Sequence, residues 1–155
     1  MQKMMGLVRR CIEDYNMIEA GDRVAVGVYG GKDSLTLLVV LAALREYYPI
    51  KFDLAALSVD MGLGGMDFSP VAELCARLNV PYLVKKTEIG PIIFDYRKEK
   101  NPCSMCAKMR RGALNDLMRE QGYNKIALGH HYDDAVETFL MSLLYEGRIS
   151  CFEPV

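Results

Sequence analysis

One short stretch constrains the fold more than any other part of the chain. An apolar, valine-rich run at 24–28 leads into the pair Gly30 and Gly31, and a helical run over 34–47 follows. This order predicts a buried strand, a tight loop and a helix N-terminus. Glycines let backbone N–H groups close on an anion, and the helix dipole and the charge of Lys32 attract it. The stretch therefore predicts a phosphate-binding loop.

The rest of the chain alternates strands with helices. Gly-Pro at 90–91 and Asn-Pro at 101–102 predict that 88–101 is irregular. The alternation predicts an α/β fold, a doubly wound parallel sheet with helices on both faces. The length of 155 residues suits one domain, so we expect an amphipathic helix within 1–21 packed on a domain at 22–155. Strands are expected at 24–28, 52–59, 81–85 and 125–128, and helices at 2–19, 34–47, 69–78, 102–121 and 133–145.

Polar residues cluster where predicted strands end. In parallel sheets, ligands bind beyond the carboxyl ends of the strands. Three groups of residues follow strands in this way, so we expect them to share one site. They are the loop 29–34 after the first strand, Ser58 and Asp60 after the second, and Gly129, His130, His131, Asp133 and Asp134 after the fourth.

Two common nucleotide-binding motifs are absent from the loop. A P-loop requires glycine where this chain has Val26, and the spacing of Gly27, Gly30 and Gly31 does not fit the dinucleotide fingerprint. An ordinary strand-to-helix turn with a serine N-cap is the simplest alternative. Residues 29–34 match the pattern Ser-Gly-Gly-x-Asp-Ser at five of six positions, with Tyr29 in place of the first serine.

That pattern resembles the loop of the PP-loop superfamily, the N-type ATP pyrophosphatases. The resemblance implies that ATP is cleaved between its α and β phosphates and that AMP is transferred to an oxygen of the substrate. It also implies roles for individual residues. Nucleotide contacts are expected from Tyr29, Gly30, Gly31, Lys32, Asp33, Ser34, Ser58, Asp60, Gly129 and His130, and catalytic roles from Lys32, Asp33, Arg110 and Asp134.

The segment 129–138 contains both histidines of the chain and a pair of adjacent aspartates. Carboxylates that face a bound triphosphate would suit Mg²⁺, which prefers carboxylate and phosphate oxygens, so we expect Asp133 and Asp134 to bind it. The simpler reading is that these carboxylates only favour the N-terminus of a helix. The order Gly-His-His-x-Asp-Asp-x-x-Glu-Thr is similar to a signature of the tRNA-modifying members of the superfamily, lysidine synthetases and 2-thiocytidine synthetases.

Two of the five cysteines, Cys103 and Cys106, lie one helical turn apart. Their spacing alone leaves open half of a zinc site, a redox pair or an iron–sulfur site. We expect Cys11 and Cys75, on apolar helix faces, to belong to the core.

The sequence around this pair resembles that of the 2-thiocytidine synthetases, whereas lysidine synthetases lack the pair. The resemblance implies that both thiolates bind a [4Fe–4S] cluster with one iron open to sulfur. The third ligand would then lie past Val155, and we expect the chain to be the N-terminal part of a longer protein.

Charge and hydropathy indicate which partners and which location to expect. The net charge of −1 argues against general nucleic-acid coating, but six basic residues and one acid fall within 97–111, which we interpret as a basic patch or a solvated helix flank. No apolar run is long enough to span a bilayer and no secretory signal is apparent, so we expect a cytoplasmic protein without membrane contact. The partners implied are tRNA and a sulfur donor such as a cysteine desulfurase; a homodimer stays open.

Together these features resemble an ATP-dependent tRNA thiolation enzyme with ATP, Mg²⁺ and a [4Fe–4S] cluster as cofactors. A cytidine carbonyl oxygen would be adenylated, and sulfur held at the cluster would displace AMP. Two alternatives stay open. One is another adenylating PP-loop enzyme, either lysidine synthetase-like or acting on a small molecule. The other, suggested by Tyr29, is a nucleotide-binding module without chemistry.

Overall fold

In a computed structural model, residues 2–97 and 102–151 are described. The strands are β1 (Arg23–Gly27), β2 (Asp53–Asp60), β3 (Tyr82–Lys86) and β4 (Lys125–Leu128). The helices are α1 (Gln2–Asp14), α2 (Lys32–Tyr47), α3 (Ser69–Arg77), α4 (Ile89–Pro91) with its continuation η1 (Ile92–Arg97), α5 (Pro102–Glu120), and α6 (Tyr132–Met141) with its continuation η2 (Ser142–Glu146).

The four strands form one sheet in the order β3-β2-β1-β4. β1 pairs in parallel with both β2 and β4, and β2 pairs in parallel with β3. The connections run outward from β1 through β2 to β3, and the chain then returns to the other side of β1. The strand order therefore reverses beside β1, where ligands bind in open α/β sheets.

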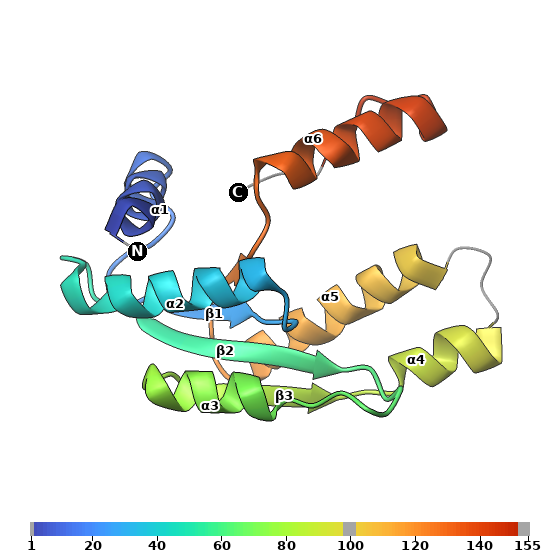
Figure 1. The fold of residues 1–155 in the computed structure, drawn as a ribbon, viewed down its shortest axis with the longest axis horizontal. Coiled ribbons are helices and arrows are strands. Elements are labelled where there is room, and N and C mark those ends of the chain that lie inside the picture. The colour runs from blue at the N-terminus through green and yellow to red at the C-terminus, as the bar shows by residue number, and fades with distance from the viewer. Residues whose placement is uncertain (1, 98–101, 152–155) are drawn as a thin grey trace.

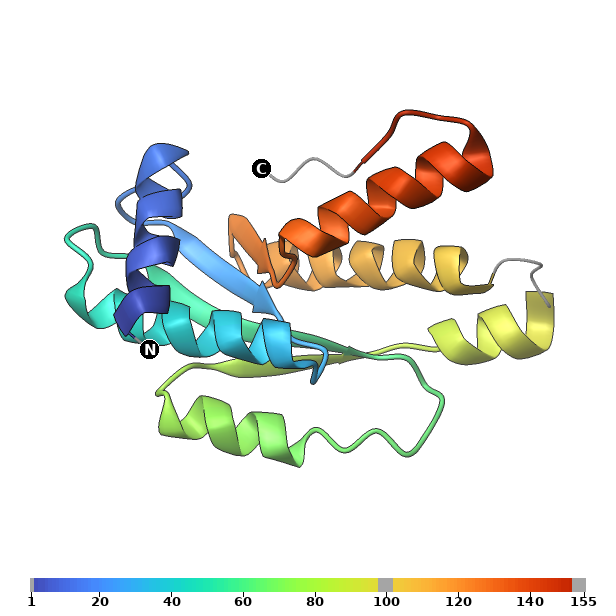
Figure 2. The same ribbon diagram turned by 45° about the horizontal axis from the view of Figure 1, so that its top comes forward.

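Helices cover both faces of the sheet, as the alternating pattern predicted (Figures 1 and 2). Side chains alternate along β1, so Val24 and Val26 pack into a core with α1, α2 and α3, whereas Ala25 belongs to a second core on the opposite face. Ile93 of η1 and Leu114 of α5 complete that second core. The α/β prediction is thus confirmed.

The prediction that 88–101 is irregular was wrong for 89–97, which is helical; 98–101 lie outside the described residues. Pro91 lies in the first turn of α4, where its missing N–H group disrupts no helical hydrogen bond. Ile89 and Ile93, four residues apart, are buried on one face. The apolar spacing therefore outweighs the Gly-Pro signal.

The first helix is shorter than predicted. It ends at Asp14 rather than at residue 19, because Asn16 adopts a left-handed conformation (φ 49°) and the Met17 N–H bonds back to the Ile12 carbonyl at 3.0 Å. Cys75 is buried, as predicted, but Cys11 is exposed. Only the Ile12 side of α1 reaches the core.

The C-terminal helix differs from the others. None of the described residues of α6 is buried, and several large apolar side chains of α6 and η2 are exposed. The views show α6 leading away from the end of β4 (Figures 1 and 2). Across the described residues, no helix combines the length and hydropathy needed to cross a bilayer.

Candidate functional site

The loop after β1 has the geometry that its glycines predict. Gly30 is left-handed, with φ of +80°. Gly31 is the N-cap residue of α2, and no side chain caps this helix end within the described part of the chain. Ser34 does not serve as N-cap; its hydroxyl donates to the Gly31 carbonyl at 3.0 Å and accepts from the Tyr29 N–H at 3.4 Å. The first backbone N–H groups of α2 therefore suit an anion.

Gly129 allows β4 to end directly against this loop. A Cβ atom at Gly129 would lie 2.7 Å from the Ser34 nitrogen and 2.8 Å from the Asp33 carbonyl carbon. Both are backbone atoms of the first turn of α2, so they cannot move aside as a flexible side chain can. Glycine at this position brings the histidine-containing segment and the predicted phosphate loop together.

Charged groups meet where the two segments touch. The Lys32 ammonium lies 2.9 Å from an Asp33 carboxylate oxygen, which lowers the pKa of Asp33 and raises that of Lys32. The His131 Nε2 lies 4.0 Å from Asp33, and its Nδ1 lies 3.6 Å from Asp134. Asp134 also accepts the His131 N–H at 2.8 Å in a capping box of α6. Asp134 thus caps α6, and Asp133 and Asp134 both lie in its first turn, where the helix dipole favours carboxylates.

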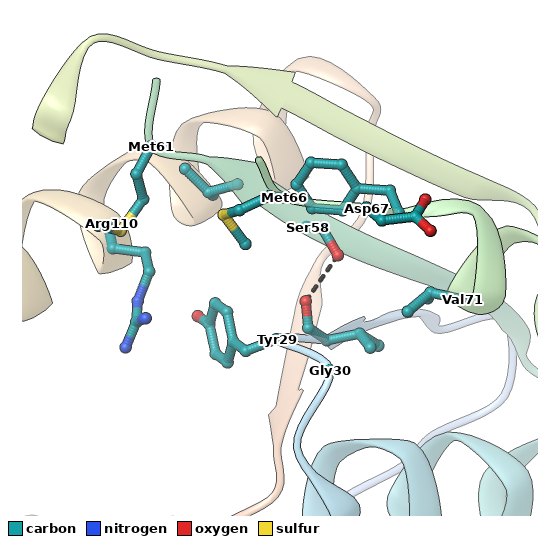
Figure 3. A pocket seen from close by; sticks show the side chains of 11 residues that line it. Tyr29, Gly30, Ser58, Met61, Met66, Asp67, Val71 and Arg110 are labelled. Atoms are coloured by element: carbon teal, nitrogen blue, oxygen red, sulfur yellow. Dashed lines mark hydrogen bonds between the residues drawn. The ribbon is translucent and has the colours of Figure 1, made fainter. Parts of the chain in front are cut away.

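A cavity of about 120 Å³ opens on one side of the loop (Figure 3). Tyr29 and Gly30 line it from the loop, and Arg110 lines it from α5. The Arg110 Cζ lies 4.3 Å from the centroid of the Tyr29 ring, which is a cation–π contact. Burial raises the pKa of the Tyr29 hydroxyl, although the charge of Arg110 opposes the shift. The hydroxyl is therefore neutral around pH 7.

Ser58 also lines this cavity, but its hydroxyl is already engaged. It donates to the Val28 carbonyl at 2.6 Å and accepts from the Tyr82 hydroxyl at 2.9 Å. Asp60, at the end of β2, accepts the Gly62 N–H at 3.0 Å and does not line the cavity. The Ser58 hydroxyl thus joins β2 to Val28 and Tyr82, and the Asp60 carboxylate holds the turn at Gly62.

The two cysteines lie on the same face of α5 as Arg110, since they precede it by seven and four residues. Cys103 is exposed, and the Cys106 thiol lies 3.5 Å from the Met61 sulfur. Met61 lines the cavity beside Tyr29. Among the described residues, no group of three metal-binding side chains occurs. The Cys106 thiol thus contacts a residue that lines the cavity, and Cys103 lies one helical turn before it on the same helix.

Seven of the predicted site residues line one of two cavities. The first has Tyr29, Gly30, Ser58 and Arg110 in its lining. A second, of about 240 Å³, lies between α1, α2 and the end of β4, and it contains Asp33, Gly129 and His130 along with Met4 and Val8 of α1. Asp133 and Asp134 lie on the first turn of α6.

Sequence reasoning missed part of the first cavity. Met66, Asp67, Phe68 and Val71 line it from the loop before α3 and from α3 itself. Asp67 accepts the Ser69 N–H at 2.9 Å, and the hydrogen bonds from Ser69 lower the pKa of this carboxyl. An aspartate two residues before a helix-starting Ser-Pro pair is the signal that indicates this turn.

Comparisons with known proteins agree with this geometry. Residues 5–151 match the family of PP-loop domains. A tRNA-cytidine(32) 2-sulfurtransferase of Geobacter metallireducens is 41% identical over 99% of this chain and 60% of its own length. The chain spans about half to three fifths of the length of the curated relatives that it matches.

Two solved structures are similar. The U34-tRNA thiolase NcsA from Methanococcus maripaludis, solved with its [4Fe-4S] cluster, has a TM-score of 0.74 and 26% identity over 86% of this chain and 46% of that protein. An NH3-dependent NAD synthetase from Campylobacter jejuni has a TM-score of 0.52 and 18% identity over 96% of this chain and 74% of that one, which supports the fold alone. By the family match over nearly its whole length, the chain belongs to the family of PP-loop domains.

Proposed function

We propose that this chain is the ATP-binding domain of an ATP-dependent tRNA sulfurtransferase that thiolates a cytidine. The observation that carries the proposal is the contact between Cys106 and Met61, at 3.5 Å, because Met61 lines the same cavity as the phosphate loop. The helix that carries both thiols therefore reaches the cavity beside the phosphate loop through Cys106 and Arg110. The curated relatives named tRNA-cytidine(32) 2-sulfurtransferases support the same activity.

In the proposed reaction, the phosphates of ATP lie along residues 29–34. A cytidine carbonyl oxygen attacks the α phosphorus, the bond to the β phosphate breaks, and pyrophosphate leaves. Lys32, whose side chain is 82% exposed, stabilises the charge that develops on the departing pyrophosphate. Asp33 orients the Lys32 ammonium. Arg110 adds a second positive charge from α5. Residues 1–21 are proposed to be an appended helix and 22–155 the ATP-binding domain.

We place Mg²⁺ beside Asp133 and Asp134. Both carboxylates lie in the first turn of α6, close to the loop through the contacts of His131. Mg²⁺ commonly takes only one or two protein carboxylates and completes its shell with phosphate oxygens and water. The lack of a three-residue cluster among the described side chains is therefore compatible with this site.

Cys103 and Cys106 would bind the [4Fe–4S] cluster. Thiolates are the usual ligands of such clusters, and the Cys106 thiol contacts Met61 of the cavity lining, so the donor type and the position fit. The third ligand is proposed to lie past Val155, as the resemblance implies; Cys151 instead donates to the Ala135 carbonyl on α6 at 3.3 Å. The bound cluster would supply the sulfur that replaces the activated oxygen.

Further partners follow from the same proposal. The basic segment 97–111 would contact the tRNA backbone; of its charged side chains, those of Lys108, Arg110 and Arg111 lie in the described part. The charged side chains at 97–100 lie outside it. A sulfur donor such as a cysteine desulfurase, a homodimer and a cytoplasmic location belong to the proposal as well.

The test is thiolation of tRNA by the anaerobically reconstituted protein. We expect Cys103→Ala and Cys106→Ala each to abolish thiolation and bound iron while ATP binding persists. Cys11→Ala, which removes an exposed cysteine remote from α5, is the matched control and should retain both. Thiolation that survives loss of both α5 cysteines would remove the cluster from the proposal.

Tyr29 favours one second candidate, a nucleotide-binding module without chemistry, because it replaces the loop serine of the PP-loop pattern. Exchange of labelled pyrophosphate into ATP separates the two. A module without chemistry binds ATP saturably and shows no exchange, whereas the proposed enzyme exchanges pyrophosphate when its acceptor tRNA is present.

A further inference from the structure

Tyr29 occupies the loop position at which the PP-loop pattern has serine. A tyrosine hydroxyl lies too far from its own backbone to make the contact that a serine hydroxyl makes. Its ring instead extends toward α5, where the guanidinium of Arg110 lies over its face at 4.3 Å (Figure 3). The hydrogen bonds among the described residues do not include the Tyr29 hydroxyl, so the ring face makes the specific contact.

The contact leaves the charge of Arg110 available. Among the residues that the structure describes, no carboxylate forms an ion pair with this guanidinium. An aromatic face holds a cation without neutralising it and without using its N–H donors. Arg110, Tyr29 and Gly30 line one cavity, so the donors are held at the edge of the phosphate loop.

We infer that Tyr29 is a positioning residue that holds Arg110 beside the phosphate loop, and that Arg110 supplies the phosphate contact that serine makes in the common pattern. This inference rests on the proposed function, since its ligand is the phosphate of ATP. An arginine that is already ordered loses less side-chain freedom when it binds an anion, and its planar fork matches phosphate oxygens. The pair thus preserves phosphate binding in a loop that has lost its hydroxyl.

The experiment measures dissociation constants for Mg-ATP and for pyrophosphate by calorimetry. Tyr29→Phe keeps the ring face and should bind both within about twofold of the original protein. Tyr29→Leu removes the face and should weaken both by about 3- to 10-fold. Arg110→Met removes the charge and should weaken both by about 10-fold or more.

The decisive comparison is the double variant. Because Tyr29 acts through Arg110, Tyr29→Leu should have no further effect once Arg110→Met is present. Arg119→Met makes the same replacement at an exposed position of the same helix and should leave binding unchanged. Thermal unfolding of each variant identifies any loss that comes from misfolding, and Tyr29→Phe keeps the test informative if Tyr29→Leu unfolds.

Several outcomes would overturn the inference. Equal losses in Tyr29→Phe and Tyr29→Leu would assign the effect to the hydroxyl, and additive losses in the double variant would make the two residues independent. If the original protein thiolates tRNA and the Tyr29→Leu variant binds pyrophosphate normally, this inference is wrong and the proposed function stands. Tight ATP binding with the predicted coupling but no thiolation contradicts the proposed function alone, and failure to bind either ligand contradicts both.

Discussion

The two ends of the parallel sheet carry similar residue types and use them in opposite ways. At the amino end, Asp22 is buried and accepts hydrogen bonds from the Glu19 N–H, the Asn124 amide and the Lys125 ammonium, all within 2.8 Å. At the carboxyl end, Lys32 and Asp33 pair with each other while their side chains stay 82% and 44% exposed. The first group joins structural elements, whereas the second faces solvent.

This difference separates stability from ligand binding. Asp22 ties the entry of β1 to the start of β4 through partners that are more than 100 positions away along the chain. Its contacts are satisfied within the protein, so they contribute to folding. The charges beside the phosphate loop retain donors for a ligand. We therefore expect substitutions at the amino end to change unfolding, and substitutions at the carboxyl end to change binding and turnover.

The largest expected effect is that of Lys32→Ala. Loss of a charge that stabilises the departing pyrophosphate should lower the rate of pyrophosphate exchange by about 10²- to 10³-fold. Because this side chain is mostly exposed, the midpoint of thermal unfolding should stay within about 2 °C. A large drop in that midpoint with unchanged exchange would reverse the assignment of the two ends.

Gly129→Ala should affect both stability and ATP binding, because Gly129 lies where β4 meets the phosphate loop. The added Cβ would press on backbone atoms of Asp33 and Ser34, which should cost about 1–3 kcal/mol of stability and weaken ATP binding together. Gly112→Ala is the matched control, since a Cβ there meets nothing within 4 Å and an alanine within α5 should stabilise by about 0.5–1 kcal/mol. Equal behaviour of the two variants would contradict the close approach.

Asp22→Asn should lower the free energy of unfolding by about 2 kcal/mol at pH 7 without changing ATP affinity. Burial alone would raise the pKa of Asp22, but the hydrogen bonds from Glu19, Lys125 and Asn124 outweigh it and lower the pKa. Because the pKa of Asp22 is lower in the folded protein than in the unfolded chain, its ionised carboxylate stabilises the fold at pH values above the unfolded-state pKa. This stabilisation is lost as the pH falls.

The difference between Asp22→Asn and the original protein should therefore be full at pH 7 and shrink below about pH 4. Denaturant titrations at several pH values measure it. Asp53→Asn is the control, since its carboxylate is 75% exposed and lies 3.7 Å from Arg23, so the cost should stay below about 0.5 kcal/mol.

The two ends also differ in how well the sequence predicts them. The loop 29–34 is contiguous, and its glycines and charge fix the local backbone, so its motif sufficed to predict an anion site. The Asp22 network joins Asp22 to Asn124 and Lys125, residues that only the return of β4 beside β1 brings together. No local pattern marks such a network.

The same contrast between local and long-range signals explains the other differences between the sequence predictions and the structure. Glycine and proline at 90–91 predict a break in the helix, although Pro91 lies where a helix tolerates it. The lining residues Met66 and Phe68 follow a glycine-rich loop whose path depends on tertiary packing: a Cβ at Gly90 would lie 2.4 Å from the Leu63 side chain. Local signals predicted the strands and most helices, whereas contacts between distant segments required the structure.

The smallest expected effect comes from Ser58. It lies at the carboxyl end of the sheet, but its hydroxyl is hydrogen-bonded within the protein, as the Asp22 carboxylate is at the amino end. It is 2% exposed, and its proton is donated to the Val28 carbonyl, so it has none left to donate to a nucleotide. Ser58→Ala should cost about 1 kcal/mol of stability and weaken ATP binding by about twofold or less.

Tyr82→Phe should cost a similar amount, and the double variant less than the sum, because the two hydroxyls share one hydrogen bond of 2.9 Å. Denaturant unfolding and calorimetric binding of ATP measure the two quantities side by side. If Ser58→Ala instead abolished ATP binding at unchanged stability, burial within the sheet would no longer distinguish structural polar groups from ligand-binding ones. The position of a residue along the strand would then decide its role, and the contrast between the two ends would extend to buried hydroxyls as well as to exposed charges.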